Sequence, residues 1–102
     1  VVVSEALRFL EEQLMENPDA PTFTVIWFGT PHAPWASLES DRDPFAKLSF
    51  QAQRHYGELV AMDRSIGTLR SGLQKLGVAD NTLLWFSSDN GGLPNKDFQP
   101  TV

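Results

Sequence analysis

Hydrophobic residues recur every three or four positions in two stretches of the chain, which is the spacing of an amphipathic helix. The first stretch covers about residues 4–17 and ends at Asn17-Pro18, because the residue before a proline avoids the α region. The second covers about residues 50–76 and is followed by Gly77, a typical C-terminal cap. The pattern therefore predicts two helices. The apolar stripe of the second comprises Tyr56, Leu59, Met62, Ile66, Leu69, Leu73 and Leu76.

Two short apolar segments follow these helices. Residues 22–28 come after the first predicted helix, and residues 82–87 come after the second. The first segment is short and rich in β-branched and aromatic side chains, and its second half is continuously apolar. Such runs are typical of strands buried on both faces. We therefore expect two buried strands, with Trp27, Trp85 and Phe86 in the core.

The order of these elements predicts an α/β fold, a parallel β-sheet with flanking helices. A strand, a helix and a second strand imply a right-handed crossover, and parallel strands end at the same edge of a sheet. The segments that follow residues 28 and 87 should therefore meet at one edge, where open α/β sheets bind ligands. A long proline-containing loop, residues 30–45, leaves that edge. Long loops of this kind are often functional.

Composition narrows the possible partners. The chain of 102 residues has a net charge of −5 and no basic block, so we expect no nucleic-acid partner. No apolar run approaches the length of a membrane span, so we expect no membrane partner. The chain has no cysteine, which excludes disulfides, thiolate metal sites and cysteine nucleophiles. Its first residues, Val1–Ser4, lack the pattern of a signal peptide, and nothing in the sequence indicates a compartment.

The strongest candidate for chemistry is Ser88-Asp89-Asn90-Gly91, directly after the second predicted strand. Asp89 offers a carboxylate and Asn90 an amide oxygen, both suited to Ca²⁺ or Mg²⁺. Gly91 lets the backbone turn sharply beside a ligand. Taken alone, the tetrad is better described as an ordinary Asn-Gly turn with Asp89 as a cap.

A second candidate is His32, between two prolines and four residues past the first predicted strand. Pro31 and Pro34 stiffen the loop, so the ring would be held in place to protonate a leaving group or contact an anion. The alternative is a histidine exposed on a loop.

Four other residues need an assignment. Asp63 falls on the apolar face of the long helix, where a carboxylate should be paired or should cap another group. His55 is expected on the surface, and Trp35 either lines a pocket or covers the loop. Lys96 is the cation nearest to the Asp89 segment, and we expect a surface role for it.

Together, the blocks resemble the sulfatase family. Pro31-His32-x-Pro34 after an apolar strand looks like that family's histidine motif, and Tyr56–Gly67 is similar to the segment downstream of it. Leu76–Gly91 resembles its most recognisable internal block. The blocks occur in the family's order, and the resemblance covers about Ser4 to Gly92.

The resemblance implies an alkaline-phosphatase-like fold and hydrolysis of a sulfate ester, either a small molecule or a carbohydrate. Asp89 and Asn90 match two calcium ligands of the family, although Mg²⁺ would also suit them. His32 matches a histidine that contacts the sulfate or assists the leaving group.

The sequence also departs from the family pattern. The family nucleophile is a formylglycine made within a Cys/Ser-x-Pro-x-Arg motif, which is absent here, as are the paired aspartates that complete the calcium site. We therefore expect residues 1–102 to be an internal part of a sulfatase catalytic domain, inactive alone and with only weak calcium binding. Exposed edges of such a partial sheet would favour self-association.

Two other interpretations remain open. The chain could belong to a phosphodiesterase or phosphatase of the same superfamily, although those enzymes tend to carry histidine where Asn90 stands. It could also be a small, non-catalytic α/β interaction domain in which Asp89 and Asn90 merely form a turn.

Overall fold

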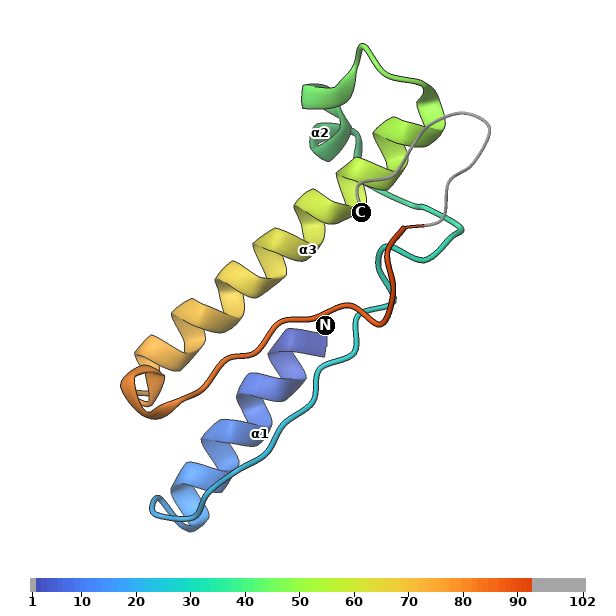
Figure 1. Cartoon of the computed structure of the whole chain (residues 1–102). Helices are drawn as coiled ribbons and strands as arrows, with labels where there is room; N and C mark the ends of the chain where they lie inside the picture. Colours follow the sequence, from blue (N-terminus) through green and yellow to red (C-terminus); the bar gives the residue numbers. More distant parts are fainter. Residues whose placement is uncertain (1, 93–102) are drawn as a thin grey trace. The chain divides into compact units, whose positions relative to one another are not determined.

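The computed structural model describes residues 2–92, which belong to two compact units. Within the described residues, unit 1 is formed by residues 2–29 and 63–82, and unit 2 by residues 30–62 and 83–92. The regular elements are the α-helices α1 (Val2–Glu16), α2 (Glu39–Arg42) and α3 (Phe50–Lys75), and the 3-10 helices Asp43–Phe45 and Ala79–Asn81 (Figure 1). Helix α3 contributes its first half to unit 2 and its second half to unit 1.

Both long helices confirm the prediction made from apolar spacing. Helix α3 ends in a Schellman motif, in which Gly77 has a φ of 73°. The Gly77 amide donates to the Gln74 carbonyl at 3.0 Å, and the Val78 amide donates to the Leu73 carbonyl at 3.1 Å. Val78 also packs against the cluster that contains Leu73, so the cap is both hydrogen-bonded and apolar.

The predicted parallel β-sheet is wrong, since residues 2–92 contain no strand. Residues 22–29 and 83–88 run as non-helical chain, and neither segment is paired with a neighbour (Figure 1). A strand exists through backbone hydrogen bonds to a second strand, and an apolar run does not itself supply that partner. Here the two segments also belong to different units, which a strand-by-strand interpretation of the sequence did not anticipate.

The core of unit 1 lies between α1 and the second half of α3. Val3, Leu69 and Leu73 are buried at its centre. In Figure 1 the two helices of this unit run in the same direction. Partly buried hydrophobic residues surround the centre, and they are Leu7, Leu10, Ile26, Phe28, Val78 and Ala79.

The segment of residues 22–28 has one face on this core and one face in solvent. Ile26 and Phe28 pack against the core, whereas the intervening Trp27 is 87% exposed. Residues 22–25 are all exposed, and over residues 25–28 exposure alternates with the period of two that extended chain produces. The prediction that Trp27 belongs to the core is therefore wrong.

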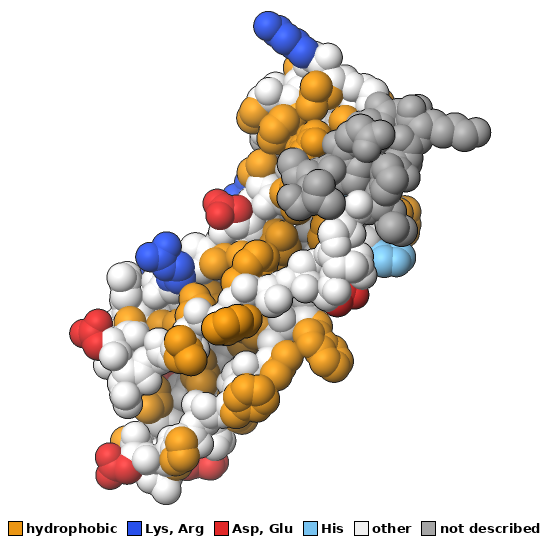
Figure 2. All heavy atoms as spheres, in the orientation of Figure 1, with side chains coloured by type: hydrophobic (Ala, Val, Ile, Leu, Met, Phe, Trp, Pro, Cys, Tyr) orange, Lys and Arg blue, Asp and Glu red, His pale blue; other side chains and the backbone are white. Residues whose placement is uncertain are grey.

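The predicted burial of the second apolar segment is also wrong, because Trp85 is 80% exposed and Phe86 is exposed with it. Figure 2 shows hydrophobic side chains open to solvent on the face in view. Within residues 2–92, no helix is both long and apolar enough to cross a membrane.

Candidate functional site

His32 lies in a bent segment of unit 2, where the Thr30-Pro31 and Ala33-Pro34 peptide bonds are both cis. The ring is exposed, and its Nδ1 lies 2.6 Å from the Ala33 carbonyl oxygen. A carbonyl oxygen only accepts, so this contact places the proton on Nδ1 and leaves Nε2 to meet a ligand. The indole Nε1 of Trp35 donates to the Pro31 carbonyl at 2.7 Å and closes the bend.

The same loop is attached to α3 by a hydrogen bond between backbone and carboxylate. The Ala36 amide donates to Glu58 Oε1 at 2.6 Å. One turn earlier on α3, the His55 ring meets the Trp35 ring edge-on, with 5.2 Å between centroids and 72° between planes. Trp35 therefore packs against α3. These two contacts hold Trp35 and Ala36 against α3, and so they fix one end of the segment that carries His32.

His55 is 5% exposed, so its predicted surface position is wrong. Its ring lies between Trp35 and Tyr56, whose centroid is 5.3 Å away. Burial lowers the pKa of His55 from its usual value of 6.5, and the nearby Glu58 carboxylate opposes that shift. Sequence reasoning missed this burial because the covering residue, Trp35, is distant in the chain.

The Ser88–Gly91 tetrad is an exposed bend held by its own side chains. Ser88 Oγ donates to the Asn90 carbonyl at 2.5 Å, and the Asn90 amide donates to Asp89 Oδ1 at 3.0 Å. Asn90 Nδ2 donates to the Gly91 carbonyl at 2.8 Å, which leaves Asn90 Oδ1 as the acceptor that a ligand would meet. These are local contacts between side chains and the backbone one or two residues away, and they fix where the side-chain oxygens lie.

The side-chain oxygens of Asp89 and Asn90 fit a hard divalent cation. Both residues are exposed, and carboxylate and amide oxygens are the donors that Ca²⁺ and Mg²⁺ prefer. Ca²⁺ takes ~6–8 oxygen ligands, so these side chains would form part of a larger shell. Within residues 2–92, no group of three or more His, Cys, Asp or Glu side chains is arranged to hold a metal ion.

His32 and the Asp89-Asn90 pair belong to the same compact unit. No hydrogen bond or ion pair joins them within the part of the chain that the structure describes. The structure therefore brings the two predicted site segments into one unit without joining their side chains.

The remaining candidates divide as follows. Asp63 is exposed on α3, so its predicted place on the apolar face is wrong. It lines a shallow depression of unit 1 together with Leu7 and Gly67. Lys96 lies outside the described residues.

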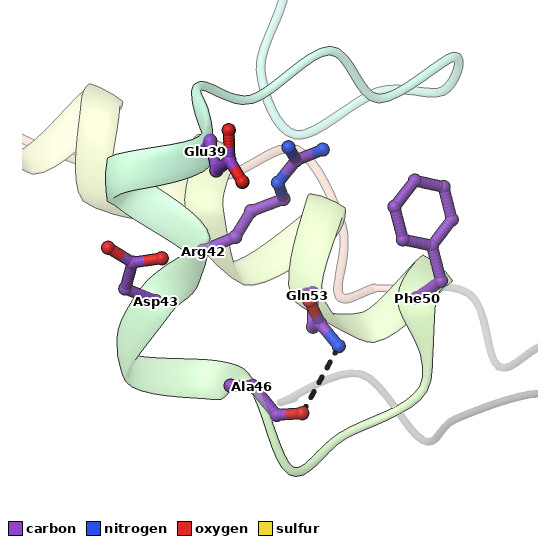
Figure 3. A pocket seen from close by; sticks show the side chains of 6 residues that line it. All are labelled: Glu39, Arg42, Asp43, Ala46, Phe50 and Gln53. Carbon is purple, nitrogen blue, oxygen red and sulfur yellow. Dashed lines mark hydrogen bonds between the residues drawn. The ribbon is translucent and has the colours of Figure 1, made fainter.

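One concave feature of unit 2 was missed by sequence reasoning. It is a cavity between α2 and the start of α3 (Figure 3). Its lining residues are Glu39, Arg42, Asp43, Ala46, Phe50 and Gln53. The only sequence signal was the length of the 30–45 loop, because the cavity depends on how α2 folds back beside α3.

Comparison with known proteins gives a consistent family. Residues 1–101 match the family described as Sulfatase. The chain is 38% identical over 93 residues to the N-acetylgalactosamine-6-sulfatase of Homo sapiens, across 89% of this chain and 16% of that protein. It is 31% identical over 107 residues to an ulvan-active sulfatase of Formosa agariphila, across 88% of this chain and 20% of that protein.

The chain thus spans a fifth or less of the length of these relatives. No solved structure matches it significantly.

Proposed function

This chain belongs to the sulfatase family, and on that premise we propose that it supplies part of the active site of an enzyme that hydrolyses sulfate esters. The observation that carries the proposal is the family match across residues 1–101, which contains His32, Asp89 and Asn90. The human relative is named for a sulfated sugar, N-acetylgalactosamine 6-sulfate. We therefore take a carbohydrate sulfate ester as the substrate class.

Asp89 and Asn90 are proposed to hold Ca²⁺ through their side-chain oxygens. The bend at Ser88–Gly91 supports this role, because its internal hydrogen bonds direct Asn90 Nδ2 toward Gly91 and leave Oδ1 for a ligand. When bound, the cation supplies electrostatic stabilisation to the oxygens of the sulfate group. Asn90 favours this assignment over a phosphatase-like site, since an amide oxygen suits a hard cation better than a transition metal.

His32 is proposed to act on the leaving oxygen of the ester. Cleavage of the sulfur–oxygen bond leaves negative charge on that oxygen, and a protonated imidazole within hydrogen-bond reach would neutralise it. The ring is exposed, and its Nδ1 is engaged with the Ala33 carbonyl, so Nε2 is the atom that faces a substrate. General acid catalysis of this kind contributes ~10²–10⁴-fold to a rate.

The 102 residues are proposed to be inactive without the rest of a sulfatase. They contain no Cys/Ser-x-Pro-x-Arg segment from which the family's formylglycine nucleophile is made. Two side-chain ligands also leave most of a calcium shell unfilled. Calcium affinity of this chain should therefore be weak, roughly millimolar or weaker.

Metal binding is tested with Tb³⁺, an oxygen-seeking ion that Ca²⁺ displaces. Trp85 lies four residues before Asp89 and is exposed, so it is placed to sensitise Tb³⁺ emission. We expect sensitised emission from the chain, its loss in D89A and N90A, and its displacement by Ca²⁺. D80A, which changes an exposed aspartate of the Ala79–Asn81 helix, is the matched control. Equal emission from D89A and the unchanged chain would contradict the assignment.

The reaction is tested in a chimera in which this chain replaces the matching part of the ulvan-active sulfatase. We expect the chimera to hydrolyse 4-nitrophenyl sulfate in preference to 4-nitrophenyl phosphate. H32A should lower kcat by ~10²-fold or more, whereas H55Q should lower it far less. Preference for the phosphate ester would favour the phosphatase alternative. A folded chimera without activity on either ester would favour the non-catalytic one.

A further inference from the structure

The cavity of unit 2 has a volume of about 190 Å³ and opens between α2, the turn that follows it and the first turn of α3 (Figure 3). Pockets for drug-sized ligands measure ~300–1,000 Å³. The space therefore suits a single small ring. The lining does not include His32, Asp89 or Asn90.

Phe50 supplies an apolar surface at the cavity. It is the first residue of α3 and is 60% exposed. The guanidinium carbons of Arg42 and Arg54 each lie 5.6 Å from the centre of its ring. Cation–π contacts of this kind hold an exposed aromatic ring in place. Phe50 nevertheless remains exposed to solvent.

Hydrogen-bond donors and acceptors line the same cavity as Phe50. Arg42 extends from α2 toward Phe50 as a donor, and Glu39 extends from the same helix as an acceptor (Figure 3). Gln53 Nε2 donates to the Leu48 carbonyl at 2.8 Å and to the Ala46 carbonyl at 3.4 Å. Donors and acceptors thus line the same cavity as Phe50.

The cavity has no excess of positive charge. Among its lining residues, Glu39 and Asp43 carry negative charge and Arg42 carries positive charge, so nothing favours a bare anion. This argues against a site for free sulfate or phosphate, which needs a local positive field. It favours a neutral ligand that both donates and accepts hydrogen bonds.

The residues that line the cavity are also preorganised before a ligand binds. A Cβ added at the buried Gly57 would lie 2.7 Å from Ser37 Cβ and 3.1 Å from Arg42 Cγ, so only glycine allows this approach to α3. The stem of Arg42 is therefore fixed by packing, while Gln53 holds the turn at Ala46–Leu48. Preformed sites lose little free energy to ordering when a ligand binds.

The geometry points to a binding site for one neutral monosaccharide ring at Phe50, Arg42 and Glu39. A pyranose has an apolar face of C–H groups, which suits Phe50, and a rim of hydroxyls that donate to carboxylates and accept from guanidinium groups. This proposal deepens the proposed function, on which it rests for the sulfate ester. The cavity would hold a sugar ring of the substrate, and the ester chemistry takes place elsewhere.

The test is an NMR titration of the ¹⁵N-labelled chain with methyl β-D-galactopyranoside and with methyl α-D-glucopyranoside. At least one glycoside should shift the amides of residues 39–54, with a Kd of roughly 1 mM to 10 mM. F50A should weaken that binding ~10-fold or more, because stacking surface is lost. F50W should retain it. F9A, which removes an exposed phenylalanine of α1, is the matched control and should bind normally.

Three results would overturn the proposal. These are the absence of shifts at residues 39–54 with both glycosides, unchanged binding by F50A, and equal shifts when sodium sulfate alone is added. The last would identify an anion site instead. Metal binding is measured independently, by the loss of sensitised Tb³⁺ emission in D89A. Failure of the sugar site and failure of the proposed calcium ligands are therefore distinguishable.

Discussion

Gly72 of α3 lies so close to Leu7 of α1 that a Cβ at position 72 would fall 2.5 Å from Leu7 Cδ1. Gly67, one and a half turns earlier on the same helix, has no such neighbour within 4 Å. Glycine costs a helix interior ~1 kcal/mol relative to alanine. At Gly72 this cost is offset by the close approach of the two helices, whereas at Gly67 no such contact offsets it.

G67A should therefore stabilise the chain by about 0.5–1 kcal/mol. G72A should be about 1–3 kcal/mol less stable than G67A, because overpacking of a tight contact costs that much. Urea unfolding followed by circular dichroism measures both. Adding L7A to G72A should recover part of the difference, and strictly additive effects of the two changes would contradict the contact.

Paired substitutions at neighbouring positions test the alternation of exposure over residues 25–28. I26K should destabilise unit 1 by about 2 kcal/mol or more, since it places a charge against the apolar core. W27K should stay within about 0.5 kcal/mol of the original chain, because Trp27 is exposed. Thermal unfolding of the two variants gives the comparison. Equal losses would show that both faces of this segment are buried.

The helices could be predicted from the sequence, whereas the strands could not. Apolar spacing and Gly77 are local signals, and the bounds of α1 and α3 followed from them within about two residues. Pairing of residues 22–28 depends on a partner that an apolar run does not specify. Trp27 and Trp85, which the predicted sheet would have buried, are therefore exposed.

The same distinction applies to the candidate sites. The bend at Asp89 and Asn90 depends on hydrogen bonds between residues one or two positions apart, so a turn there could be predicted from the tetrad itself. Burial of His55 depends on Trp35, which lies 20 positions earlier in the chain. The cavity at Phe50 likewise depends on Gly57 admitting Ser37 and Arg42. Contacts between residues so far apart in the chain are set by packing and leave no periodic pattern in the sequence.

Burial of His55 predicts a pH-dependent stability. Its pKa is lowered in the folded chain, chiefly by desolvation, so the unfolded chain binds a proton first as the pH falls below 6.5. The stabilising contribution is complete above that pH and is lost as the pH falls through the folded-state value. Unfolding by urea between about pH 8 and about pH 5 should show this decline. H55Q should remove it, and H32Q, at an exposed ring, should leave it intact.

Glu58 anchors the loop that carries His32, because its Oε1 accepts from the Ala36 amide at 2.6 Å. E58A should destabilise the chain by about 1–2 kcal/mol, since a hydrogen bond to a charged group is lost from a half-exposed site. Hydrogen exchange at the Ala36 amide should accelerate by ~10-fold or more, as 1.4 kcal/mol of opening free energy corresponds to a factor of ten. E58Q retains an acceptor oxygen and should show a smaller change at both readouts. E11A, at an exposed glutamate of α1, is the control and should alter neither. If Ala36 exchanged equally fast in E58A and E11A, the loop would owe its position to Trp35 packing on His55 alone.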